Sequence, residues 1–230
     1  MKRFYKTVTV DETPEGFRFL LDGKAVRTPA RQPLLLPTLA LAEAVAAEWR
    51  EQGEEMQPAA MSLTRLVNTV LDGIRNTRDD VVGAILRFGE NDLLAYRAET
   101  PVELAARQQQ WDDILDWAAQ AHGARLAVTA GIAHLDQPPE ALAALRDAVA
   151  RRSDFELAAL HVTASITGSL ILGLAVLDCR LTPEGAFGLS RLDEAFQAEQ
   201  WGMDREAEAR AGRLADEIAH AAMLVRLSRA

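Results

Sequence analysis

The feature that most constrains the fold is a long uncharged stretch, LAALHVTASITGSLILGLAVL, at residues 157–177. A helix of this length and hydropathy must be covered either by a lipid bilayer or by other helices. The stretch carries polar side chains along its length, at His161, Thr163, Ser165, Thr167 and Ser169. We therefore expect a central helix that other helices surround, and no membrane span.

The segments on both sides of this stretch have the spacing of amphipathic helices. From residue 38 onward, apolar residues recur three and four positions apart, as they do on one face of a helix. Alanine is abundant in these segments, which favours helix formation and close packing. We expect helices over residues 38–53, 61–75, 79–88, 101–122, 138–152, 154–177, 183–200 and 204–228.

The beginning of the chain has a different pattern, which is typical of β-strands. Residues 8–10 and 17–21 alternate between apolar and other side chains. Between these segments and the next lies the pair Asp22-Gly23, which favours a two-residue hairpin turn because both positions of such a turn need positive φ. Residues 34–36 are expected to form a further strand between two prolines.

This change of pattern predicts an α+β protein, with a small N-terminal β-rich domain followed by a larger α-helical domain. We expect the N-terminal domain at residues 1–60, including one helix, and the helical domain at residues 61–230. The sequence shows no internal repeat and no Gly/Ser linker. Because the chain begins directly with a strand pattern and has no signal or transit segment, we expect a cytoplasmic protein.

Composition excludes several classes of protein. The net charge of −9 repels nucleic-acid phosphates and anionic membranes. The single cysteine, Cys179, allows neither an intramolecular disulfide nor a thiolate-rich metal site, and we expect it to be buried or half-buried. The histidines lack the spacing of metal ligands, and they stand at His122, His134, His161 and His220. We expect no metal and no cofactor.

Motifs of catalysis are also missing from the sequence. Gly168 and Gly173 have the spacing of a phosphate loop, but the Lys-Ser/Thr pair that must follow is absent, and we expect both glycines inside a helix. No G-x-S-x-G nucleophile elbow occurs. A small-molecule enzyme whose site is assembled from distant residues remains an alternative, because such sites are defined by geometry.

The segment from Asp193 to Ala207 combines carboxylates with a tryptophan where two helices meet. Gly202 is expected to end the first helix, and Asp204 is expected to cap the second. Two interpretations are open for the acidic residues Glu199 and Asp204. They either organise the corner between the helices or form an acidic lip beside Trp201, which would anchor a protein partner.

An ordered set of short motifs resembles a known family over nearly the whole chain. The motifs are Arg3-Phe4-Tyr5-Lys6, Leu21-Asp22-Gly23, Leu36-Pro37, Ala47-Glu48-Trp49, Leu63-Thr64-Arg65-Leu66, Asp92-Leu93-Leu94, Tyr96-Arg97-Ala98, Gln110-Trp111-Asp112, Gly168-Ser169 and the Asp193–Ala207 segment. They are similar to the ATP-synthase assembly chaperones of mitochondria and alphaproteobacteria, the family named for ATP-synthase assembly protein twelve. The chain departs from the family pattern at Ala95, often Cys, and Asp113, often Pro.

The resemblance implies a β-rich N-terminal domain, an α-helical domain and a chaperone function without catalysis, cofactor or small-molecule substrate. The implied partner is the unassembled alpha subunit of the soluble catalytic head of ATP synthase, which the chaperone shields until the beta subunit replaces it. Bacterial members would act in the cytoplasm, and eukaryotic relatives in the mitochondrial matrix. A permanent subunit of a stable complex is a further alternative. The expected partner-binding residues are Glu199, Trp201, Asp204, Glu194, Arg97 and Trp49. Two of them have a structural alternative: the helical phase of Trp49 fits a core position, and Arg97 fits an anchor of a buried turn through its guanidinium donors.

Overall fold

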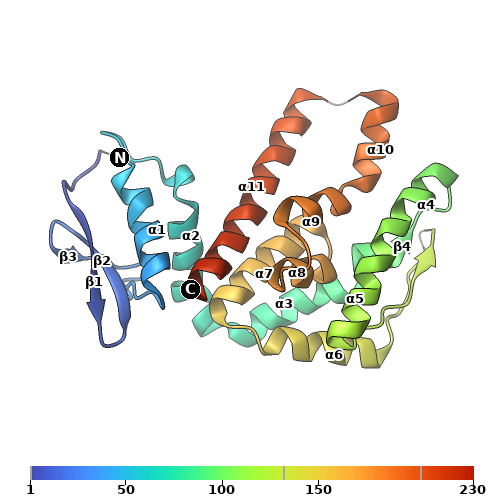
Figure 1. Ribbon diagram of the computed structural model, residues 1–230, viewed down its shortest axis with the longest axis horizontal. Coiled ribbons are helices and arrows are strands. Elements are labelled where there is room, and N and C mark those ends of the chain that lie inside the picture. The colour runs from blue at the N-terminus through green and yellow to red at the C-terminus, as the bar shows by residue number, and fades with distance from the viewer. Residues whose placement is uncertain (1, 132, 203) are drawn as a thin grey trace.

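The computed structural model describes residues 2–131, 133–202 and 204–230. At the N-terminus, three strands form an antiparallel sheet in the order β1 (Val8–Thr13), β2 (Gly16–Leu21) and β3 (Lys24–Ala25) (Figure 1). Asp22 and Gly23 both have positive φ, at 48° and 77°, as the hairpin turn requires. The predicted hairpin is therefore confirmed.

The expected strand at residues 34–36 is only partly present. Leu36 forms an isolated bridge with Phe17, in which the two residues exchange backbone hydrogen bonds of 2.8 and 2.9 Å. A second bridge joins Arg27 to Pro33. Because proline lacks an N–H group, the segment cannot extend into a continuous ladder.

Helices make up most of the remaining chain, as expected for a small sheet followed by a larger helical region (Figure 1). Their bounds are α1 (Leu39–Arg50), α2 (Ser62–Asn68), α3 (Arg78–Glu90), α4 (Val102–Gln108), α5 (Asp112–His122), α6 (Pro139–Ala150), α7 (Asp154–Thr167), α8 (Leu170–Leu177), α9 (Pro183–Ser190), α10 (Leu192–Trp201) and α11 (Arg205–Ser228). Shorter helical turns lie at Pro58–Ala60, Thr69–Gly73, Ile74–Asn76, Leu93–Ala95 and Gln109–Trp111. The strands β4 (Tyr96–Arg97) and β5 (Thr129–Ala130) pair in parallel.

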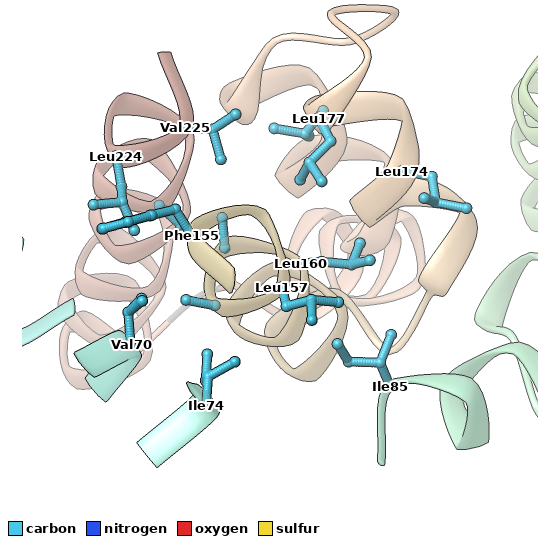
Figure 2. Close-up of a cluster of buried hydrophobic side chains, with 14 of the residues drawn as sticks. Val70, Ile74, Ile85, Phe155, Leu157, Leu160, Leu174, Leu177, Leu224 and Val225 are labelled. Carbon is cyan, nitrogen blue, oxygen red and sulfur yellow. The ribbon is translucent and has the colours of Figure 1, made fainter. Parts of the chain in front are cut away.

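Helices α7 and α8 occupy the centre of the helical region. Figure 2 shows Leu157 and Leu160 of α7 among side chains that come from α3, α8 and α11 and from the turns that follow α2. Every residue of α8 is buried, as expected for a helix that is apolar on all sides. No helix in the described ranges is both long and apolar enough to cross a membrane.

The prediction of one continuous helix over residues 154–177 is wrong. Gly168 has a left-handed conformation, with φ of 69°, and ends α7. Ser169 then caps α8 by accepting a hydrogen bond from the Leu172 N–H at 3.0 Å. The buried carboxylate of Asp92, distant in sequence, accepts another from the Ile171 N–H at 3.0 Å. These polar partners stabilise a break that the apolar pattern does not reveal.

Two further predicted helices are also divided. The segment 101–122 forms α4, a 3₁₀ turn and α5, and the segment 183–200 forms α9 and α10 with a break at Arg191. The two breaks meet in space: Trp111, which is 1% exposed, donates its indole N–H to the Leu189 carbonyl at 2.9 Å. Tertiary packing thus overrides the helical periodicity of both segments.

Buried residues of the N-terminal and helical regions form one continuous cluster. Helices α1 and α2 pack against α11, and the Thr38 hydroxyl donates to the Leu227 carbonyl at 2.5 Å. The division of the chain at residue 60 stays a prediction. The prediction that Cys179 is buried or half-buried is wrong: the residue is exposed, because it follows α8 in a left-handed turn with φ of 57°.

Candidate partner-binding site

Helix α10 lies on the surface. It packs against α4 and α9, and none of its residues, all of which the structure describes, is buried. At its end stands Trp201, whose side chain is 80% exposed. An indole this exposed is unusual, since tryptophan is highly buried on average. Helix α10 therefore presents a large apolar side chain to solvent.

The carboxylate of Glu199 makes a two-pronged ion pair with the guanidinium of Arg107 on α4. The two N–H···O distances are 2.7 and 2.6 Å. The hydrogen bonds from Arg107 lower the pKa of Glu199 below its usual value, so the carboxylate stays charged. Arg107 also lies over the Phe196 ring, 5.2 Å from its centroid. Glu199 thus holds α10 against α4 while its carboxylate remains accessible to a partner.

The corner between α10 and α11 lies where the sequence predicts that one helix ends and the next begins. Gly202 ends α10 with φ of 83°, and its N–H bonds to the Ala198 carbonyl at 2.8 Å. Asp204 occupies the N-cap position of α11, but among the described residues its side chain accepts no capping hydrogen bond. Met203, within the predicted segment, lies outside the described residues. The carboxylate of Asp204 is therefore not engaged in capping α11.

Glu194 lies at the start of α10 and forms an ion pair with Arg191 at 2.7 Å, three residues earlier. Its neighbour Asp193 accepts a hydrogen bond from the Gln108 amide at 2.8 Å. Gln108 is almost fully buried, and its amide oxygen accepts the Ala98 N–H at 2.7 Å. The first turn of α10 is thus attached to α4 and to the segment that precedes it.

Arg97 lies beneath this contact rather than on its surface. Its guanidinium donates to the Gln108 carbonyl, pairs with Asp112 at 2.7 Å and lies 5.0 Å from the centroid of the Trp111 ring. Burial lowers the pKa of Arg97 from its usual value, and the nearby Asp112 carboxylate opposes that effect. The position of Arg97 allows it to support the α4–α10 contact.

Trp49 belongs to α1, and Figure 1 shows α1 away from the corner between α10 and α11. Its ring packs between Tyr5 and Phe19, with centroid distances of 5.6 Å to each. Its indole N–H donates to the Thr64 hydroxyl at 3.2 Å. The fold thus brings Glu199, Trp201 and Asp204 to one corner. Glu194 lies at the other end of α10, near the contact that Arg97 supports, and Trp49 lies elsewhere. A role in binding stays a prediction for all six.

Sequence reasoning missed Arg107 and Gln108, which hold α10 in place. Their partners Glu199 and Asp193 are 92 and 85 residues away in the chain. No local pattern links residues so far apart. The one available signal was the run of polar residues 107–110 inside the predicted helix 101–122.

Both the sequence and the fold of this chain match known proteins. The model of the family described as ATP12 chaperone protein matches residues 2–119, just over half of the chain. The chain belongs to the ATP12 chaperone family. The resemblance to ATP-synthase assembly chaperones is thereby confirmed, and the α+β fold with it.

Two solved structures and one curated relative are similar to this chain over 90% or more of its length. The crystal structure of Atp12 from Paracoccus denitrificans is 41% identical, covers 99% of this chain and 98% of that chain, and has a TM-score of 0.95. A candidate chaperone from Agrobacterium tumefaciens is 46% identical, with coverage of 100% and 86% and a TM-score of 0.93. Mitochondrial Atp12 from Schizosaccharomyces pombe is 24% identical over 219 residues, covering 90% of this chain and 75% of the relative.

Proposed function

We propose that this chain binds the unassembled alpha subunit of the soluble head of ATP synthase and covers it until the beta subunit replaces it. Membership of the ATP12 chaperone family supports a role in the assembly of ATP synthase. The observation that carries the proposed binding site is Trp201, 80% exposed at a corner that also bears Glu199 and Asp204. We propose no catalytic activity, and action in the bacterial cytoplasm.

Masking is the physical task of such a chaperone. A free subunit exposes apolar surface that its neighbour later covers, and such surface drives aggregation. The chaperone must cover this surface and still leave when the permanent partner arrives. That requirement favours a moderate interface with a few strong contacts over an extensive apolar one.

The α10–α11 corner has the chemistry for such an interface. Trp201 supplies a large apolar contact, and tryptophan is enriched among the residues that dominate binding energy. Glu199 and Asp204 supply carboxylates for basic or amide groups of the partner. Because Arg107 already holds the Glu199 side chain, that side chain would lose little conformational freedom on binding.

A pull-down after co-expression tests this function. The chain is tagged, and the alpha and beta subunits of the ATP synthase head are probed separately. We expect recovery of alpha alone and its release when beta is added. Recovery of neither subunit with soluble, folded chain would contradict the proposal.

The Glu199→Lys variant tests the site within that experiment. We expect alpha binding to be lost while the melting temperature stays near that of the wild type, because the residue is exposed. Glu217→Lys is the matched control, since it makes the same charge change at an exposed position of α11 that lies away from the corner. A collapsed melting temperature of Glu199→Lys would show that Glu199 is structural, and binding unchanged from wild type would exclude it from the interface.

A further inference from the structure

A second surface feature lies at the other end of α11 from Trp201. A groove of about 840 Å³ runs between the end of α8, the loop that follows it and the last turns of α11. Its lining is mostly apolar, with contributions from Val176, Leu181, Pro183, Ala222 and Met223. An apolar groove that opens to solvent is a surface on which another apolar group can dock.

Arginines stand at the rim of this groove. They are Arg180, Arg226 and Arg229, against one acidic lining residue, Glu184. Arg229 is already held by Glu156, whereas Arg180 and Arg226 form no ion pair within the described part of the chain. In a protein with a net charge of −9, this is a local concentration of positive charge. The complementary occupant is an apolar side chain flanked by carboxylates.

The α10–α11 corner of this same chain has that chemistry. Trp201 is 80% exposed, and Glu199, Asp204 and Glu206 lie within five residues of it. The corner cannot reach the groove of its own molecule. The part of α11 from Arg205 to Arg226, which rises about 1.5 Å per residue, separates the corner from the groove arginine by about 30 Å.

We propose that the groove binds the α10–α11 corner of a second copy of this chain. Trp201 enters the apolar floor, and the carboxylates beside it face Arg180 and Arg226. Each contact joins one corner to one groove. Self-association covers the exposed tryptophan while no client is bound, and a client that uses the same corner competes with it. The contact itself needs no ATP synthase subunit, so it can be tested apart from the proposed function.

Sedimentation equilibrium of the full chain alone tests the proposal. We expect the weight-average mass to rise above the 25.1 kDa of the monomer as the concentration increases. Arg226→Glu in the groove and Trp201→Ser at the corner should each weaken the association at least about tenfold. Arg213→Glu, the same charge change at an exposed position of α11 outside the groove, should leave it unchanged.

Mixing the two variants sharpens the result. The Arg226→Glu chain keeps its corner, and the Trp201→Ser chain keeps its groove, so one contact remains possible between them. We expect a 1:1 pair in the mixture and nothing larger. A wild-type chain that stays monomeric, self-association that both variants retain, or a mixture without pairs would each overturn the proposal.

Discussion

Helices α8 and α10 are close in length, at 8 and 10 residues, and close in the chain, yet their surroundings are opposite. Every residue of α8 is buried, whereas α10, described in full, has no buried residue. Apolar packing holds α8, and polar contacts from Arg107 and Gln108 hold α10. The comparison teaches that α8 serves the stability of the fold, while α10 is positioned without being covered and stays available for binding.

The largest effect on stability is expected in the buried region. Leu160 is fully buried, and its Cδ1 lies 2.7 Å from the place that a Cβ on Gly173 would occupy. We expect Leu160→Ala to lower the free energy of unfolding by about 2–5 kcal/mol, because it leaves a cavity between α7 and α8. Chemical denaturation measures this loss. In the control Leu39→Ala, at an exposed leucine, a change of less than about 0.5 kcal/mol is expected.

The second largest effect on stability is expected from Asp92, whose carboxylate accepts a hydrogen bond from the first turn of α8. Burial raises the pKa of Asp92 to about 6 from 3.8, although hydrogen bonds from the Ile171 and Leu94 N–H groups oppose the rise. Between these two pH values the folded chain binds more protons than the unfolded chain, so stability falls as pH increases. The loss amounts to about 3 kcal/mol and is nearly complete about one pH unit above the folded pKa of about 6.

Denaturation of the wild type and Asp92→Asn over this pH range checks the prediction. The difference between their unfolding free energies should change with pH in that window, because the variant cannot titrate. The absolute stability of the variant is not the readout, since an amide cannot accept from both N–H groups as a carboxylate does. A pH-independent difference would show that burial does not raise the pKa of Asp92 above that of the unfolded chain.

At the exposed α10–α11 corner, we expect a substitution to change binding much more than stability. We expect Trp201→Ala to change the free energy of unfolding by less than about 0.5 kcal/mol but to weaken alpha-subunit binding by about 10- to 100-fold. Calorimetry with the purified subunit measures the affinity. Gln200→Ala, at the preceding exposed residue, is the matched control and should bind normally. Undiminished binding of Trp201→Ala would remove the tryptophan from the interface.

The smallest effect is expected for the Arg107–Glu199 pair. Because both side chains are exposed, Arg107→Glu should lower the melting temperature only slightly. It should, however, speed amide hydrogen exchange in α10, since two acidic side chains would then face each other. The double variant Arg107→Glu with Glu199→Arg restores opposite charges and should slow exchange again. Equal exchange in all three proteins would mean that the pair does not hold α10.

The same two helices show how far the sequence predicts the fold. The sequence predicts that residues 157–177 are buried, because a long uncharged and mostly apolar stretch must be covered by other parts of the chain. The break at Gly168 depends on caps that include Asp92, a distant residue, and the pattern does not reveal it. The acids and tryptophan of the corner are visible in the sequence, but their support by Arg107 and Gln108 arises only when α4 and α10 meet.

Amide hydrogen exchange of the full chain, with and without the purified alpha subunit of ATP synthase, tests the binding site most directly. If the α10–α11 corner is the interface, exchange should slow over residues 192–202 and 204–210 when the subunit binds. Residues 157–177 should change little, because they are already buried. Slowed exchange confined to the N-terminal sheet and α1, with none at the corner, would contradict a client site at Trp201.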